Sequence, residues 1–227
     1  MTGSFKTTFS QLAHFTTLPD EVLDQLSKIA VRQTIPAGKV IYWEGEPAEA
    51  VYLLEEGWVK ATRLSRKGRE QAMMVLRPVD LFGDIAVFTE GVYPGTVTAL
   101  EDVTVWSLSA RHLQDGINLY PDLANAFLRH FAYRVLHYLQ LVEDLSLHSV
   151  EARLARTLVR YAQSVDDQWV VPRRPWATYD EMAARLGTVR DVLSRALKTL
   201  EAKGYLRVEK HGIILLERQL LAEYEDL

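Results

Sequence analysis

Apolar side chains recur with a heptad pattern over residues 121–147, a stretch that no glycine interrupts. The positions alternate in steps of four and three: Ala124, Leu128, Phe131, Val135, Tyr138, Val142 and Leu145. Such a seam is typical of a helix that pairs with a second helix, so we predict a dimerisation helix rather than a helix buried in one globular core. Phe127, Leu136 and Leu139 form a second apolar stripe, which we expect to face the preceding domain.

The pattern before this helix is that of a β domain. Between residues 33 and 108, turn residues separate short apolar runs at 40–42, 51–54, 58–64, 71–76, 96–100 and 103–108. Short strands at even spacing predict a barrel or sandwich, preceded here by an amphipathic helix at 18–30. Residues 81–88 interrupt the strands with a tight glycine turn and a short helical turn. Backbone N–H groups freed at that turn could bind an anion, and an ordinary barrel corner is the alternative.

The pattern after the long helix predicts three further helices and a hairpin. We expect Ser149 to cap the first helix, and a loop or small hairpin to follow at 166–175. Residues 178–181, Thr-Tyr-Asp-Glu, form a capping box. Gly187 ends that helix, and we expect Thr188 to cap the next one. Two helices joined by a glycine turn and followed by a hairpin, here at 205–216, describe a winged helix-turn-helix, which binds DNA.

Polar residues cover one face of the second of these two helices. Arginines can pair with guanine through two hydrogen bonds, and a carboxylate can accept a hydrogen bond from cytosine N4. The candidate DNA-binding residues are Thr178, Thr188, Arg190, Asp191, Ser194, Arg195, Lys198, Lys210 and His211. A surface helix laced with salt bridges is the alternative. Charge favours DNA, because residues 173–210 contain nine Lys or Arg and five Asp or Glu in a chain of net charge −4.

Composition excludes several kinds of functional site. The 227 residues include no cysteine, which excludes disulfides, thiolate nucleophiles and cysteine-bound metals and is consistent with a cytoplasmic location. No histidine lies between residues 33 and 108, so a metal- or haem-dependent enzyme would lack imidazole ligands in the β domain. We interpret His130 and His137 as a solvated or domain-facing stripe. We therefore expect no catalytic residue, metal or cofactor, and we see no signal peptide or membrane-spanning stretch.

The glycine-rich β domain, the long helix and the winged helix-turn-helix together resemble the cyclic-AMP receptor protein/FNR family of bacterial transcription regulators. The most specific part is Val189-Arg190-Asp191 with Arg195, which matches the family's base-reading motif, although the family usually has Glu at the position of Asp191. The resemblance implies an α+β fold in three parts. These are an N-terminal β-roll of the jelly-roll-like, cyclic-nucleotide-binding-domain type (residues 1–120), a dimerisation helix (121–148) and a C-terminal winged helix-turn-helix domain (149–227).

The resemblance also bears on the effector. The residues that match the family's phosphate-binding cassette or its base-binding positions are Gly83, Asp84, Ile85, Tyr93, Pro94, Gly95, Thr96 and Tyr138. Cyclic-nucleotide-binding members have an Arg-Ser pair in place of Tyr93-Pro94 and a Thr-Ser pair in place of Tyr138-Leu139. Cyclic AMP would therefore lose its charge partner and its base partner. Tyr93 and Tyr138 would also fill part of the cavity if they point inward. The cysteines of FNR-type oxygen sensing are absent.

These observations predict a homodimeric, sequence-specific DNA-binding transcriptional regulator whose effector is not cyclic AMP. The alternative is a cyclic-nucleotide-dependent regulator with a non-standard phosphate-binding cassette. A cyclic-nucleotide-binding module without a DNA role is a competing class, and the helix-turn-helix counts against it. The predicted partners are double-stranded DNA with a pseudo-palindromic operator, a second copy of the chain, RNA polymerase and, where the roll has kept a sensing role, a small-molecule effector.

Overall fold

The computed structural model describes residues 4–64, 70–89 and 91–224. The chain divides into two compact units, residues 1–136 and 137–227. The long helix α5 (Pro121–Leu147) contributes its first part to one unit and its last part to the other. None of the described helices is long and apolar enough to cross a membrane.

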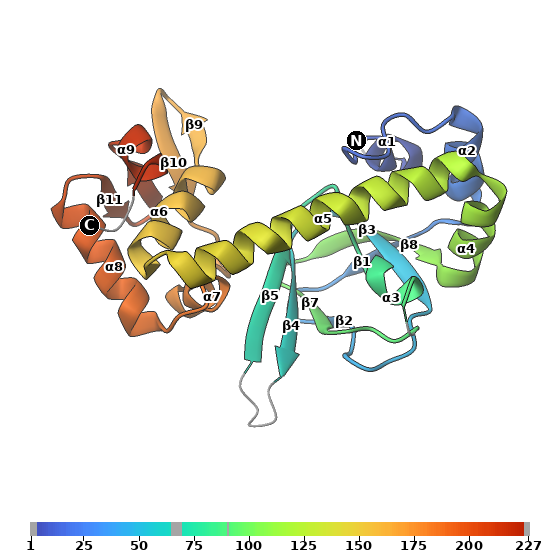
Figure 1. Ribbon diagram of the computed structural model, residues 1–227, viewed down its shortest axis with the longest axis horizontal. Coiled ribbons are helices and arrows are strands. Elements are labelled where there is room, and N and C mark those ends of the chain that lie inside the picture. Colours follow the sequence, from blue (N-terminus) through green and yellow to red (C-terminus); the bar gives the residue numbers. More distant parts are fainter. Residues whose placement is uncertain (1–3, 65–69, 90, 225–227) are drawn as a thin grey trace. The chain divides into compact units, whose positions relative to one another are not determined.

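The first unit contains two four-stranded antiparallel sheets (Figure 1). One sheet has the order β1 (Val31–Ile35), β8 (Val103–Ser109), β3 (Ala50–Glu56), β6 (Asp80–Phe82). The other has the order β2 (Val40–Tyr42), β7 (Thr96–Ala99), β4 (Val59–Leu64), β5 (Glu70–Leu76). Leu54, Val59, Phe82, Val97 and Val105, which come from both sheets, belong to one buried cluster. The predicted β-roll is confirmed, and its core lies between the two sheets.

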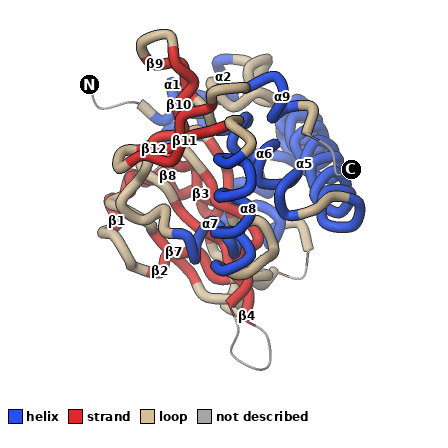
Figure 2. Tube along the Cα trace, turned by 90° about the vertical axis from the view of Figure 1, so that its left-hand side faces the viewer, coloured by secondary structure: helices blue, strands red, loops and turns tan. Residues whose placement is uncertain are grey.

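Helices of the first unit pack on a second apolar cluster. They are α1 (Phe5–Phe9), α2 (Asp20–Ile29), α3 (Asp84–Val87), α4 (Ala110–Leu119) and the first part of α5; Figure 2 shows helices in blue and strands in red. Phe5, Phe9 and Phe15 from the N-terminal segment are buried in this cluster with Leu123 and Phe127 of α5. The start of α5 is therefore part of the core of the roll unit.

The second unit contains α6 (Val150–Tyr161), β9 (Gln163–Val165), β10 (Gln168–Pro172), α7 (Tyr179–Arg185), α8 (Arg190–Ala202), β11 (Leu206–Glu209), β12 (Gly212–Leu215) and α9 (Arg218–Ala222). The predicted hairpin β11–β12 is extended by β9 and β10 into one sheet of order β11-β12-β10-β9. Asp166 and Asp167 join β9 to β10 with positive φ angles of 47° and 60°, as hairpin turns require. The segment 166–175, predicted as a loop or small hairpin, thus contains the turn and the second strand of a hairpin that begins at Gln163.

Of the two N-cap residues predicted at Ser149 and Thr188, the structure confirms one. Ser149 caps α6 as predicted, since its side chain accepts a hydrogen bond from the backbone N–H of Ala152 at 3.2 Å. The prediction that Thr188 caps α8 is wrong. The N-cap is Val189, which makes no side-chain capping bond. The turn consumes one more residue than expected, because Gly187 adopts a left-handed φ of 64° and Thr188 still belongs to the turn.

Candidate DNA-binding and effector sites

The two helices of the helix-turn-helix are held by local bonds around the turn. The Thr178 hydroxyl accepts a hydrogen bond from the backbone N–H of Glu181 at 3.2 Å, which caps α7. At the other end of α7, the Arg153 guanidinium of α6 donates to the carbonyl oxygen of Leu186. This bond satisfies a carbonyl that the end of the helix leaves open and ties α6 to the turn. The sequence pattern did not identify Arg153.

Helix α8 separates its side chains into two faces. Its buried face consists of Leu193, Ala196, Leu197 and Leu200. Among the candidate DNA-binding residues, Arg190, Asp191, Arg195 and Lys198 are exposed, and Thr188 and Ser194 are half-buried. The exposed charged face is the one that can approach DNA.

The two candidate base-reading arginines have different surroundings. Arg190 Nη1 lies 3.3 Å from Asp180 Oδ2, and both side chains are mostly exposed. Among the described residues, Arg195 has no acidic partner. Because an exposed pair such as Arg190–Asp180 contributes little, DNA can displace Asp180 at small cost. Arg195 is available to an acceptor without that displacement.

Lys210 and His211 form the turn between β11 and β12, and both are exposed. The backbone N–H of Arg173, just after β10, donates to the carbonyl oxygen of His211 at 2.9 Å. The hairpin β11–β12 is the wing. A Cβ atom at Gly212 would lie 2.5 Å from the carbonyl oxygen of Val171 in β10, so the close pairing of β10 with the wing requires glycine there. The wing is thus braced by a strand that precedes the helix-turn-helix in sequence, and an exposed arginine lies beside its tip.

In the roll, the first residue of α3 belongs to a buried ion pair. Asp84 is only 1% exposed. Arg134 Nη1 of α5 lies 2.7 Å from Asp84 Oδ1 and 2.9 Å from Oδ2, and His130 Nε2 lies 3.0 Å from Oδ2. Arg134 also donates to the carbonyl oxygen of Leu81 at 3.2 Å. His130 therefore faces the roll, which confirms the domain-facing part of its interpretation and corrects the solvated part.

Neighbouring groups set the pKa of the Asp84 carboxyl group. Burial alone would raise the pKa of Asp84, but the hydrogen bond to His130 and the charge of Arg134 outweigh burial and hold the pKa below its usual range. Asp80, in contrast, is half-buried near Arg134 and His130, and its partial desolvation raises its pKa. Asp84 is thus an anion at neutral pH whose charge is matched by α5.

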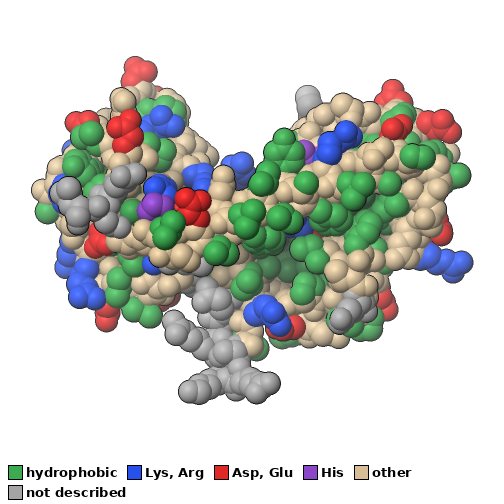
Figure 3. All heavy atoms as spheres, in the orientation of Figure 1, with side chains coloured by type: hydrophobic (Ala, Val, Ile, Leu, Met, Phe, Trp, Pro, Cys, Tyr) green, Lys and Arg blue, Asp and Glu red, His purple; other side chains and the backbone are tan. Residues whose placement is uncertain are grey.

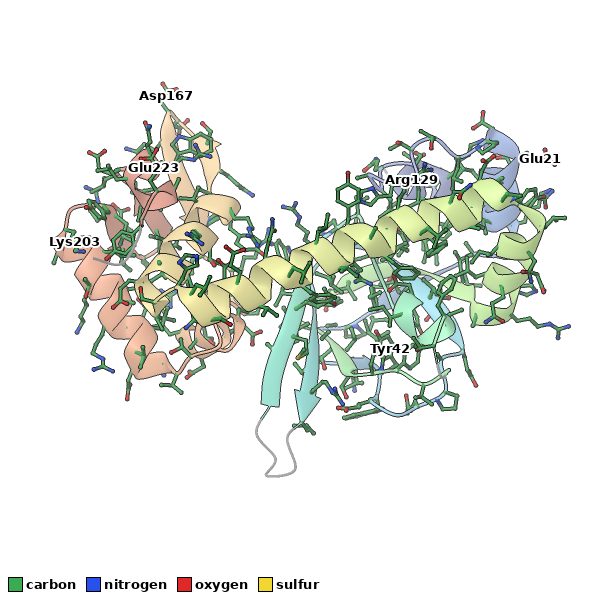
Figure 4. All side chains as sticks on the ribbon, viewed as in Figure 1. Glu21, Tyr42, Arg129, Asp167, Lys203 and Glu223 are labelled. Carbon is green, nitrogen blue, oxygen red and sulfur yellow. The ribbon has the colours of Figure 1, made fainter. Side chains whose placement is uncertain are left out.

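Tyr93 points into the roll, which for this residue meets the condition stated in the effector argument. Its side chain is 3% exposed and stacks on Tyr42, with ring centroids 3.7 Å apart; Tyr42 is labelled in Figure 4. The Tyr93 hydroxyl donates to the carbonyl oxygen of Ala50 at 2.8 Å. Burial raises the pKa of both tyrosines, so both are neutral at physiological pH. Gly83 adopts a φ of 78°, and a Cβ there would lie 3.2 Å from Tyr93.

The other candidate effector residues differ in exposure and contacts. The Thr96 hydroxyl accepts a hydrogen bond from the backbone N–H of Glu44 at 3.0 Å. Pro94 is exposed, and Ile85 and Gly95 are half-buried. Tyr138 belongs to the second unit, and its part in an effector site stays a prediction.

Helix α5 carries exposed apolar side chains along the predicted seam. Leu128, Val135 and Val142 are 66%, 56% and 60% exposed, whereas Ala124, Phe131 and Tyr138 are half-buried. The side chain of Leu145 lies outside the described ones. The second stripe was predicted wrongly as one surface, because Phe127 is buried in the roll unit whereas Leu136 and Leu139 are exposed. A spacing of nine residues from Phe127 to Leu136 turns the helix by half a turn, which separates them.

Comparisons with known proteins agree with this geometry. The sequence profile of the cyclic nucleotide-binding domain matches residues 32–120, and that of the Crp-like helix-turn-helix domain matches residues 152–224. The CRP-like cAMP-activated global transcriptional regulator of Mycobacterium tuberculosis is 28% identical, covering 82% of this chain and 84% of the relative. The cyclic AMP receptor protein of Thermus thermophilus is 28% identical, covering 90% and 92%. The solved structure of FixK2 from Bradyrhizobium japonicum, 23% identical, has the same fold, with a TM-score of 0.76 over 88% of this chain and 98% of that one.

Proposed function

This chain is a member of the cyclic-AMP receptor protein/FNR family of transcriptional regulators, and we propose that it acts as a homodimer on a pseudo-palindromic operator. The observation that carries the proposal is the exposed charged face of α8 beside a basic wing. We call the helix-turn-helix and its wing, the β11–β12 hairpin, the reader. Two readers related by a two-fold axis recognise half-sites about one helical turn apart. RNA polymerase is the further partner that a regulator of this kind requires. The curated relatives are named as regulators and not as enzymes, which argues against a catalytic role.

In the reader we assign base contacts to the N-terminal part of α8 and phosphate contacts to the wing. Arg190 and Arg195 present guanidinium groups that can bind guanine O6 and N7 through two hydrogen bonds. Asp191 can accept from cytosine N4, and its side chain is one methylene shorter than Glu. Lys210 and His211 lie on the wing turn, where contacts go to the sugar-phosphate backbone and set the register.

Replacing Arg195 with alanine is expected to weaken specific binding by about 1–3 kcal/mol, because a bidentate guanine contact is lost. Arg190→Ala is expected to cost less, because Asp180 already occupies its guanidinium in the free protein. Fluorescence anisotropy at fixed salt, on an operator selected from random DNA with the wild-type protein, measures both losses. Random duplex of the same length gives the non-specific affinity, which should change much less.

Two further variants make this test specific. Arg195→Lys keeps the charge but cannot form the bidentate contact, so it should lose most of the same affinity. Arg218→Ala is the matched control, because Arg218 is an exposed arginine of the same unit that lies over the Trp169 ring. Equal losses on operator and random DNA, or full activity of Arg195→Lys, would show that Arg195 contacts phosphate only.

We further propose that the roll does not respond to cyclic AMP. The stack of Tyr42 on Tyr93 occupies the core of the roll beside the cassette. Pro94 supplies no cation, and the guanidinium of Arg134 is already bound to Asp84. A buried phosphate without a cation would cost more than the backbone N–H groups of the turn could recover. Activation by cAMP is a property of the relative that carries that name, and we do not extend it to this chain.

DNA affinity is accordingly expected to change less than twofold when cyclic AMP or cyclic GMP is added at micromolar concentration. The titration is done on the selected operator at constant ionic strength, because salt alone shifts such affinities. One observation favours the alternative of a non-standard cassette, namely that Arg134 is a cation next to Asp84 and could exchange its partner for a phosphate. A tenfold tightening that is lost in Arg134→Gln would establish that alternative.

A further inference from the structure

Phe88 is an aromatic side chain of the roll that lies partly in solvent. It follows α3 directly as its C-terminal cap and is 42% exposed. The other part of its ring contacts α5, with centroid distances of 5.1 Å to Phe131 and 5.3 Å to Phe127. Phe88 therefore joins the short helix of the cassette to the long helix and still presents apolar surface outward.

This surface is continuous with the apolar seam of α5. Phe131 belongs to the heptad pattern and is half-buried beneath Phe88, whereas Leu128 and Val135, on the adjacent turns, are exposed. Figure 3 shows apolar side chains, in green, gathered along the long helix and on the roll beside it. We call Phe88, Leu128, Phe131 and Val135 the seam patch. All four members lie in the first unit.

The helix alone provides a short seam. Its 27 residues amount to fewer than four heptads, near the lower limit for a stable coiled coil. The beginning of α5 is also taken by the roll, because Leu123 and Phe127 are buried in that core. An aromatic side chain at the flank of the seam adds the kind of anchor in which interfaces are enriched.

We propose that the seam patch is one docking surface for a second copy of this chain, and that Phe88 brings the roll itself into the dimer interface. This inference rests on the proposed homodimer and adds a contact that the heptad pattern does not contain. Its consequence is direct, because Phe88 lies four residues after Asp84. A displacement of the cassette turn would then move a residue that contacts the partner subunit directly, without a change along the whole of α5.

The first test compares single substitutions in the full chain by sedimentation. Phe88→Glu is expected to raise the dimer dissociation constant at least tenfold, because a carboxylate would be buried against the partner. Trp43→Glu is the matched control, an aromatic residue of the roll that is 56% exposed and outside the seam patch, and should change it less than threefold. Val135→Glu, on the helix itself, should give monomers.

The second test does not depend on a destabilising charge. Because the chain has no cysteine, Phe88→Cys and Trp43→Cys each introduce one thiol. Maleimide labelling of Cys at position 88 should slow at least fivefold when the protein is concentrated from monomer to dimer, with no change at position 43. Monomers with Val135→Glu but an unchanged dimer and unchanged labelling at position 88 would overturn the role of Phe88 and leave the homodimer intact. A Val135→Glu protein that still dimerises would overturn both.

Discussion

Replacing Arg134 with methionine is expected to lower the free energy of unfolding of the first unit by about 3–5 kcal/mol. Asp84 would keep its buried carboxylate and lose the cation that lies within 2.9 Å of both oxygens. The remaining donor, His130, supplies one hydrogen bond at 3.0 Å. Urea-dependent hydrogen exchange of the full chain, followed by mass spectrometry over residues 80–89 and 121–136, measures the loss in this unit alone.

The loss should depend on pH in a defined direction. The pKa of Asp84 is held below its usual range in the folded state, so the pair stabilises the fold fully above the unfolded-state pKa of about 3.9. That contribution disappears as the pH falls through the lower, folded-state pKa. The difference between wild type and Arg134→Met should therefore be constant near pH 7 and shrink in acid.

A double-mutant cycle separates the pair from other effects of the substitution. Asp84→Asn combined with Arg134→Met should be less destabilising than the two single losses added together, by about 0.5–3 kcal/mol. Arg63→Met removes the exposed pair with Glu44, whose Arg63 Nη2–Glu44 Oε1 distance is 3.0 Å, and should cost at most about 1 kcal/mol. Additive losses, or an Arg134→Met loss no larger than that of Arg63→Met, would mean that the buried pair contributes little to the free energy of unfolding.

The parts of this fold that were predictable are those with a repeating pattern. The heptads of α5, the short apolar runs of the roll, and the Thr178 cap of α7 with the glycine turn at Gly187 each leave a local signal that one sequence reveals. Strand β1 left none, because no side chain in it is fully buried and it lies at the edge of its sheet. Helix α1 was missed for a similar reason, since five residues are too few to show a helical period.

The candidate sites divide along the same line. The charged face of α8 was predictable because a helix period places Arg190, Asp191 and Arg195 together. The contact of Asp84 with Arg134 was not, because 50 residues separate them and Arg134 belongs to no motif. Phe127 and Leu136 show the limit of pattern alone. Both are apolar residues of α5, but only packing against the roll determines which of them is buried.

Replacing Val135 with glutamate is expected to produce monomers and to lower affinity for the full operator about 100-fold or more. Val135 is exposed on α5 at the centre of the predicted seam, so a second copy would bury the new carboxylate without a partner. The two readers would then bind half-sites independently, and the gain from their linkage would be lost. Sedimentation gives the oligomeric state, and anisotropy at fixed salt gives the affinity.

A single half-site distinguishes loss of the dimer from damage to the reader. Affinity of Val135→Glu for a half-site should stay within about threefold of wild type, because the substitution leaves residues 149–224 unchanged. Gln140→Glu is the matched control, an exposed position of α5 outside the heptad positions, where the same charge should leave both dimer and operator binding unaltered. Because the full operator needs both subunits and the half-site needs one, a parallel loss on the two DNAs would point to a misfolded reader. A stable Val135→Glu dimer would place the subunit interface away from α5.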